Sequence, residues 1–267
     1  MRLSDYISDT AALLADQSNL FTSPKQLTRN INESRRLIAM YTACIRRLLA
    51  GQTAWGGSSQ PGFGIPGAIQ PGALPSAIPQ AASLAPGAGQ SLNMATIPGA
   101  ERYPFEGFFN PYLRASYGGC DSVLNVVQLS INWGGPSRPA LDWLPWDEFQ
   151  AYCRAYAFQN LAYPSVWAVL NDGSLGEVWI FPTPSQQLDM EALVDCLPSN
   201  LVDDNSPEAL PLNFQDNVKY AAAALTFMQR QQFSLAEVHD RELQRRIGIS
   251  VVSRDRGKSR SYYVGAY

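Results

Sequence analysis

The sequence predicts an α+β protein: an α-helical bundle of N- and C-terminal helices with an inserted antiparallel β domain, a long extended loop and a C-terminal arm. Three observations predict it. Residues 163–196 contain apolar runs separated by turn residues, which is typical of strands. Apolar residues recur at helical spacing on both sides, in 24–50 and 213–247. Residues 51–100 are rich in glycine and proline.

The composition allows a sizeable core and concentrates positive charge near the C-terminus. The chain has 267 residues, 46% of them hydrophobic, and a net charge of −3, which is too small to indicate a nucleic-acid or membrane partner. Residues 241–260 hold seven basic and two acidic side chains, a charge of +5, so the rest of the chain carries −8. We therefore expect an acidic body with a basic C-terminal arm.

The cysteines and the N-terminus indicate a protein made in a reducing cytosol. Four cysteines lie far apart without a CxxC motif, which predicts reduced thiols. The opening MRLSDYISD becomes polar too early for a signal peptide. No long uncharged stretch is compatible with a membrane helix, because 51–100 is interrupted throughout by proline and glycine.

Residues 1–50 are expected to supply the N-terminal helices of the bundle. The first helix spans 4–15. The second spans 24–50, with Ser23 as its N-cap, Pro24 in its first turn, Gln26 completing a capping box and Gly51 ending it. Its apolar seam consists of Leu27, Ile31, Ser34, Ile38, Tyr41, Ile45 and Leu48. The seam packs either against this protein's own helices or against another subunit.

Residues 51–100 are expected to form an extended excursion. They contain ten glycines, seven prolines and no charged residue, which favours polyproline II and excludes a long helix or a central strand. One interpretation is a disordered linker. The other is a docking loop that contacts a neighbouring subunit or a fibre through four spaced apolar residues, Ile65, Ile69, Leu74 and Ile78.

Residues 101–197 are expected to form the inserted β-rich domain. Strands are predicted at 123–131 and 138–144, followed by a short helix from Pro145 to about Tyr156. A hairpin then joins 166–170 to 178–181 through the turn residues 171–173. Alternating apolar residues predict a last strand over 188–196.

Residues 198–247 are expected to complete the bundle, and 248–267 to form the arm. The helices are predicted over 213–232 and 234–247, the second beginning at Ser234 and ending at Gly248. The arm is basic and then aromatic. It could hold DNA phosphates and bases, or it could dock on a protein whose carboxylates pair with its arginines; the acidic body favours the protein partner. Its contact residues are Arg254, Arg256, Lys258, Arg260, Tyr262, Tyr263 and Tyr267.

The sequence lacks the motifs of common catalytic sites. The one histidine, His239, is predicted on a polar helix face and has no neighbours at metal-ligand spacing. There is no phosphate-binding GxxxxGK[ST], no strand-bound GxGxxG and no GxSxG elbow. Four carboxylates, Glu148, Glu177, Glu191 and Asp195, are candidates by residue type alone. We therefore expect no enzyme activity, no cofactor and no metal.

Four segments, in this order, resemble the head-to-tail adaptor (connector) proteins of tailed bacteriophages, most closely those of short-tailed phages. LTRNINESRRLIA at 27–39 is similar to their second helix. Residues 121–150, with their LDWLPWDEFQ end, resemble their β insertion. WIFPTP at 179–184 is similar to a strand end in that family, and residues 210–227 resemble its LPxxYxxALxYYAA helix. The resemblance covers 1–50 and 101–247, while the excursion 51–100 departs from the family's compact pattern.

The resemblance implies a structural protein of the virion. Such adaptors assemble in the host cytoplasm as a twelve-fold ring below the portal protein, at the head–tail junction. They extend the channel used in DNA ejection and provide a platform for the tail or nozzle and for tail fibres. On this basis we expect a self-assembling ring that binds the portal through the arm and lets DNA pass without specific binding. No membrane contact is expected.

Three rivals remain open. A receptor- or carbohydrate-binding β module of a phage tail or fibre would use Trp133, Trp143 and Trp146 as sugar platforms. A cell-wall hydrolase would need a pair of opposed carboxylates. A DNA-binding protein would act through the basic arm and would show salt-dependent duplex binding.

Overall fold

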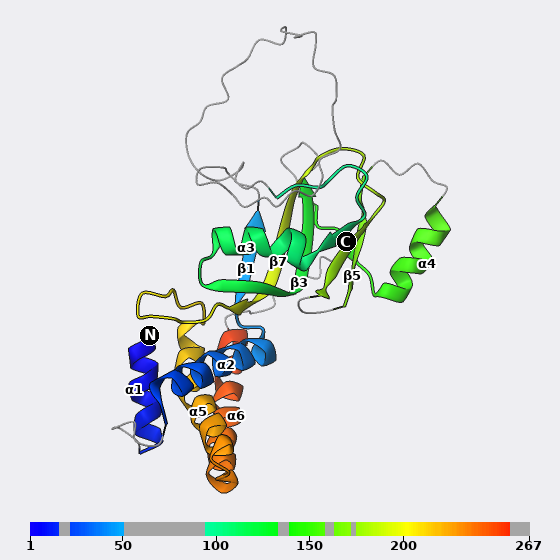
Figure 1. Cartoon of the computed structure of the whole chain (residues 1–267). Coiled ribbons are helices and arrows are strands. Elements are labelled where there is room, and N and C mark those ends of the chain that lie inside the picture. The colour runs from blue at the N-terminus through cyan, green and yellow to red at the C-terminus, as the bar shows by residue number, and fades with distance from the viewer. Residues whose placement is uncertain (16–21, 51–93, 133–138, 158–162, 172–174, 257–267) are drawn as a thin grey trace.

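The computed structural model describes residues 1–15, 22–50, 94–132, 139–157, 163–171 and 175–256. The predicted α+β class is confirmed: a helical bundle lies at one side and two sheets at the other (Figure 1). The predicted docking-loop residues Ile65, Ile69, Leu74 and Ile78 lie outside the described residues, as does Trp133.

The helical elements are α1 (Leu3–Leu13), α2 (Pro24–Thr42), the wide helical turn η1 (Phe105–Phe109), α3 (Asn110–Ser116), α4 (Trp146–Tyr156), α5 (Leu212–Gln229) and α6 (Phe233–Arg256). The strands are β1 (Arg46–Ala50), β2 (Arg102–Pro104), β3 (Cys120–Asn132), β4 (Asp142–Trp143), β5 (Val166–Leu170), β6 (Glu177–Phe181) and β7 (Asp189–Pro198). Helices α1, α2, α5 and α6 form the bundle, whereas η1, α3 and α4 pack beside the sheets.

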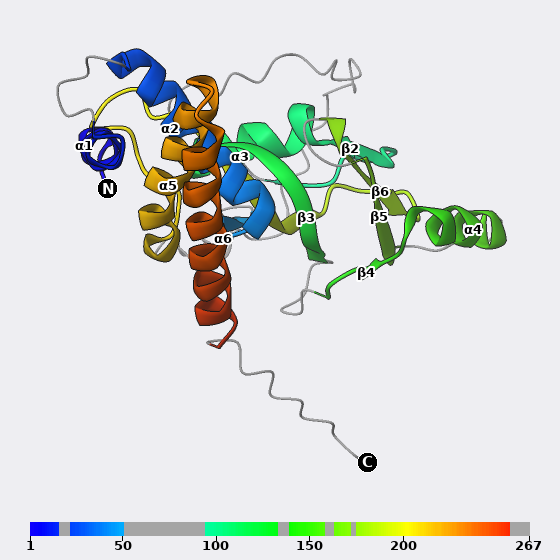
Figure 2. The same ribbon diagram turned by 90° about the horizontal axis from the view of Figure 1, so that it is seen from below.

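Helix α5 is the centre of the bundle. It packs against α1, α2 and α6, and its consecutive alanines 221–224 are all buried. These small side chains let the neighbouring helices pack closely around this part of α5. Figure 2 shows α6 beside α5, with α1 and α2 on the other sides of the bundle.

The strands form two sheets. The first has the order β1-β7-β3, all antiparallel, and the long central strand β7 places Ala192 opposite both Leu49 and Leu129. The second has the order β2-β6-β5-β4 and is antiparallel except for the β4–β5 pair, which is parallel. The predicted hairpin is confirmed as β5–β6 and the predicted last strand as β7.

One main core joins the bundle to both sheets. It runs from Tyr6 and Ile31 in the helices, through Leu129 and Met190 in the first sheet, to Trp167 in the second. A smaller cluster around Phe149 lies between α4 and the second sheet. Helix α4 thus packs at the end of the molecule remote from α1 (Figure 2). Across the described ranges, every helix is too short or too polar to span a bilayer.

The predicted helix over 24–50 is wrong in its last third. Helix α2 ends at Thr42, and its C-cap Ala43 takes the left-handed conformation at φ 44°. Residues 46–50 form β1, which pairs with β7 about 145 positions further along the chain. Ile45 and Leu49 are buried on the sheet and Leu48 is exposed. An apolar repeat this short suits either element, and the non-local pairing decides.

The predicted end of the last helix at Gly248 is also wrong. Helix α6 passes through Gly248 and continues to Arg256. Glycine costs a helix interior only about 1 kcal/mol relative to alanine, and contacts on both sides compensate. Before it, Glu242 pairs with Arg245 and Arg246. After it, the Ser250 hydroxyl donates to Asn213 O at 2.9 Å.

The aromatic stretch after residue 101 contains elements that were not predicted. These are β2, η1 and α3, where Phe105 and Phe109 are fully buried. The strand predicted over 138–144 is reduced to β4 and a single bridge between Ser130 and Ala140. Pro111, which suggests a break, instead lies in the first turn of α3, where its missing N–H costs nothing.

Candidate interaction surfaces

The residues that carry the family resemblance meet in a buried polar network between α2 and α5. Asn30 Nδ2 donates to Thr226 Oγ1 at 2.9 Å and to Gln229 Oε1 at 3.1 Å, and Gln229 Nε2 donates back to Asn30 Oδ1. The predicted N-cap is confirmed, because Ser23 Oγ accepts from Gln26 N. The Gln26 side chain instead reaches Gln229 across the helix pair. We call these contacts and those of the next paragraph the α2–α5 hub.

Arg35 extends the hub to the segment that leads into α5. Its guanidinium donates to both Glu208 oxygens, at 2.7 and 3.1 Å, to Ser199 O at 2.8 Å and to Asn32 Oδ1 at 3.1 Å. The two side chains of the ion pair are only 1% and 8% exposed. Asn32 also clamps the backbone of Leu201, accepting from its N–H and donating to its carbonyl.

Charged residues of the hub and of α5 also interact with side chains of α1. Burial, and then the negative charge of Glu208, raise the pKa of the Tyr6 hydroxyl far above its usual value. Lys219 of α5 pairs with Asp9 of α1 at 3.2 Å. A buried pair of opposite charges held by four hydrogen bonds from Arg35 favours one arrangement of the neighbouring elements. The hub therefore sets how α1, α2 and α5 pack.

Helix α6 presents an apolar stripe to solvent. Phe233, Leu235, Val238 and Ile249 are 68%, 45%, 59% and 59% exposed. Leu235 and Val238 lie one turn apart, and eleven residues amount to about three turns, so Ile249 falls on the same face. Arg241 and Glu237, which pair at 2.8 Å, border this stripe. Phe233 lies on another side of the helix, and the Glu242–Arg245 pair at 2.8 Å lies on this face between Val238 and Ile249. The stripe is therefore a mixed apolar and charged face, which suits a helix contact surface.

The opposite face of α6 packs on α5 and includes His239. Its ring stacks on Phe227 with centroids 5.3 Å apart and an angle of 8°. The prediction of a polar-face histidine is therefore wrong. Burial lowers the pKa of His239. Along the same helix, hydrogen bonds from Arg245 and Arg246 lower the pKa of Glu242 to about 2.

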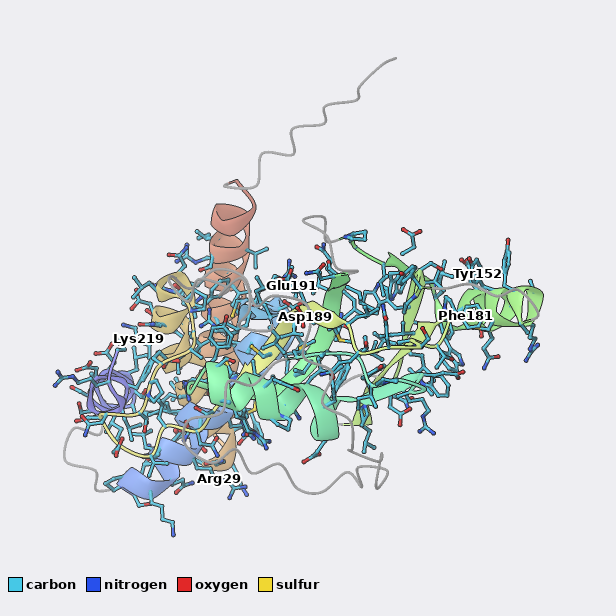
Figure 3. The ribbon with its side chains drawn as sticks, turned by 90° about the horizontal axis from the view of Figure 1, so that it is seen from above. Arg29, Tyr152, Phe181, Asp189, Glu191 and Lys219 are labelled. Carbon is cyan, nitrogen blue, oxygen red and sulfur yellow. The ribbon has the colours of Figure 1, made fainter. Side chains whose placement is uncertain are left out.

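A groove of about 510 Å³ runs along the outer face of α2. Its lining side chains are Lys25, Thr28, Arg29, Asn32, Glu33, Arg36 and Asn200. Arg29 lies on the outside of the bundle in Figure 3. Three cations face one carboxylate, and Arg36 is also held by Asp121 at 3.2 Å. This surface is suited to an anionic partner but is only mildly basic.

A second groove, of about 310 Å³, lies between α4 and the second sheet; we call it the α4 groove. Its lining side chains are Glu101, Trp146, Phe149, Gln150, Cys153, Arg154, Trp179, Ile180 and Phe181. Trp146 stacks on Phe149 and meets Trp179 edge to face, with centroids 5.8 and 5.4 Å apart. Tyr152 of α4 lies close to Phe181 of β6 (Figure 3).

The four carboxylates that were candidates by residue type lie in different surroundings. Glu177 pairs with Arg102 at 2.9 Å and Asp195 with Arg46 at 2.8 Å, so both hold strands together. Glu148 lies exposed in the first turn of α4. Figure 3 places Glu191 beside Asp189 on β7, in the middle of the molecule. Within the described part of the chain, no cluster of His, Cys, Asp and Glu could hold a metal ion.

All four cysteines are free thiols. Two of them, Cys120 and Cys196, meet in the core with their sulfurs 3.5 Å apart. The hydrogen bond from Cys196 lowers the pKa of Cys120 to about 7, assisted by Arg47, and the pKa of Cys196 rises in response. The spacing of the cysteines in the sequence gave no sign of this pair, because β3 and β7 bring it together.

The predicted arm begins inside a helix. The backbone at Arg254 and Arg256 belongs to the last turns of α6, and Lys258, Arg260, Tyr262, Tyr263 and Tyr267 lie outside the described residues. Of the predicted sugar platforms, Trp143 is 57% exposed, whereas Trp146 lies in the α4 groove. No signal in the sequence marked Trp179 as the aromatic partner of Trp146 in this groove.

Comparison with known proteins adds no relative. No protein-family model matches the chain, and no curated protein matches its sequence.

Proposed function

We propose that this protein is a structural head-to-tail adaptor of a tailed bacteriophage. In this role it forms a ring below the portal protein, extends the DNA channel and carries the tail or nozzle and its fibres. The α2–α5 hub is the observation that carries the proposal. Segments 27–39 and 210–227, which resemble adaptor helices, are far apart in the chain and supply Asn30, Asn32, Arg35 and Thr226 to one packed unit.

Two surfaces support an assembled role over an isolated one. Leu235, Val238 and Ile249 of the apolar stripe of α6 stay exposed within the described part of the chain, as expected for a surface that is covered on assembly. The basic residues at 254–260 begin in the last turn of the same helix and contrast in charge with the acidic remainder of the sequence. Pairing arginines with carboxylates of a portal would use this charge contrast.

Truncation tests the role of the arm. Removing everything after Gly248 would also remove Ser250, which bonds to Asn213 and Asn217 of α5, so the cleaner truncation ends at Arg256. We expect this variant to keep its fold by circular dichroism and to lose co-sedimentation with the portal. A chain with residues 257–267 in scrambled order is the matched control for length and charge. Normal portal binding by the truncated chain would contradict the assignment of the arm.

A receptor- or carbohydrate-binding module is the second candidate, and the α4 groove is what favours it. Trp146 and Trp179 offer aromatic faces, and Glu101, Gln150 and Arg154 offer polar groups at its edge. Stacking of a sugar ring on tryptophan with nearby hydrogen-bonding groups is a plausible chemistry for such a groove. Glycan binding that is lost in Trp146→Leu and kept in Trp143→Leu would transfer the function to this candidate.

A further inference from the structure

The α4 groove has the chemistry of a peptide-binding site. Four aromatic rings, from Trp146, Phe149, Trp179 and Phe181, line it. Its two charged side chains, Glu101 and Arg154, have opposite signs, so the groove carries no net charge. Glu101 is also engaged, because its carboxylate accepts from Thr183 Oγ1 at 2.7 Å. An aromatic, electrically neutral groove favours an uncharged ligand with flat apolar groups.

One lining residue also has an unused donor. The indole N–H of Trp179 is buried and has no hydrogen-bond acceptor among the described residues. A buried donor without a partner destabilises the site, so a small rearrangement that lets a ligand bring an acceptor to it would be favourable. Proline-rich segments in the polyproline II conformation expose backbone carbonyls and pack their rings against aromatic side chains.

The chain contains one segment with these properties. Residues 61–79, PGFGIPGAIQPGALPSAIP, have five prolines and no charge. Three apolar residues of this segment directly precede a proline: Ile65, Leu74 and Ile78. A polyproline II helix repeats every three residues and keeps its carbonyls free, so such a segment binds with little loss of conformational entropy.

The chain that follows this segment leads to the groove. Residues 94–101 run along the two sheets, held by Met190 N to Met94 O at 2.8 Å, Gly99 N to Pro184 O at 2.9 Å and Ile180 N to Glu101 O at 3.0 Å. Glu101 itself lines the groove. The segment is thus joined to the groove through residues 80–100 of the same chain, which raises its effective concentration there.

We propose that the α4 groove binds the proline-rich segment 61–79 of this protein. This assignment does not depend on the adaptor function, because it concerns a groove and a segment of the same chain. In a ring the segment would reach the groove of the adjacent subunit and brace it. In a single chain it would fold back on its own groove.

Photo-crosslinking from α4 tests the proposal on the full chain. A benzoyl-phenylalanine probe replaces Gln150, which is exposed and lines the groove. The matched control places the probe at Ala151, which is exposed on the same helix but does not line it. We expect the Gln150 probe to link to residues 61–79 in peptide mass spectra, and the Ala151 probe to do so far less. Equal yields at the two positions would overturn the proposal.

A second variant separates binding from chance proximity. Replacing Ile69 and Ile78 by aspartate places two charges in the segment and leaves α4 and the sheets untouched. Because a charge is costly in an aromatic groove, we expect the Gln150 crosslink to fall by about tenfold. An unchanged yield would show that the segment merely passes the probe and would overturn the proposal. Mixing isotope-labelled and unlabelled chains shows whether the bound segment comes from the same copy or from a neighbour.

Discussion

Breaking the ion pair in the α2–α5 hub should destabilise the bundle severely. In Arg35→Met the side chain keeps its approximate length but loses the four hydrogen bonds to Glu208, Ser199 and Asn32. Glu208, whose side chain is 8% exposed, is left as a buried carboxylate without its cation. Removing one partner of a buried pair costs about 3–5 kcal/mol, since the remaining charge is not resolvated.

Urea unfolding followed by helical circular dichroism measures this loss. The midpoint should fall with an unchanged slope, which identifies a change in stability and not in the compactness of either state. Arg241→Met is the matched control, because Arg241 pairs with Glu237 where the two side chains are 77% and 71% exposed. Exposed pairs of this kind contribute about 0–1 kcal/mol.

A double variant distinguishes the lost charge pair from lost packing. Adding Glu208→Gln to Arg35→Met removes the stranded charge, so the double variant should lose less stability than the two single variants together. A coupling of about 1–3 kcal/mol is expected for residues in direct contact. If Arg35→Met costs no more than Arg241→Met, or if the two changes are simply additive, the hub does not hold the bundle together.

Three further predictions concern strand pairing and pH. Asp195→Asn should weaken the bidentate pair with Arg46 and lower the free energy of unfolding by about 1–3 kcal/mol. Thermal unfolding measures this loss, and the amide protons of β1 should exchange faster. Exchange unchanged from the native chain would contradict the prediction. The Glu242 carboxyl should titrate with a pKa of about 2. Its contribution to folding stability is therefore fully present above the unfolded pKa and is lost as pH falls toward 2. Arg245→Gln should raise the pKa of Glu242 measured by carboxyl NMR, and an unchanged pKa would refute the pairing. The His239 ring, which is partly buried against Phe227, should titrate below its ordinary pKa. Because the unfolded chain then binds the proton more readily, stability should fall as pH drops through the unfolded pKa near 6.5. A normal pKa in NMR would place the ring in solvent.

The sequence predicted those elements that have a strong local pattern. Helix α2 begins after its N-cap Ser23, β5 and β6 pair as the predicted hairpin, and the alternation over 188–196 marks β7. Local spacing also places α5, whose apolar face continues over several turns. In each of these cases the residues that determine the element lie within it.

The errors occur where distant residues decide. Ile45 to Leu49 fit a helical seam as well as a strand, and only pairing with β7 selects the strand. Arg102 to Pro104 become β2 because β6 lies beside them. The α4 groove could be foreseen only in part, since Trp146 and Trp179 lie on different elements. The contact between Cys120 and Cys196 likewise depends on the β3–β7 register.

Electron microscopy of the full-length protein, purified from cells that also express the cognate portal protein, tests the central proposal most directly. The adaptor assignment predicts a twelve-fold ring stacked on the portal, with the C-terminal end of α6 directed at the portal and the apolar stripe of α6 covered by protein. A free monomer with no portal attached would contradict the assignment and favour the receptor- or carbohydrate-binding module as the function of the protein.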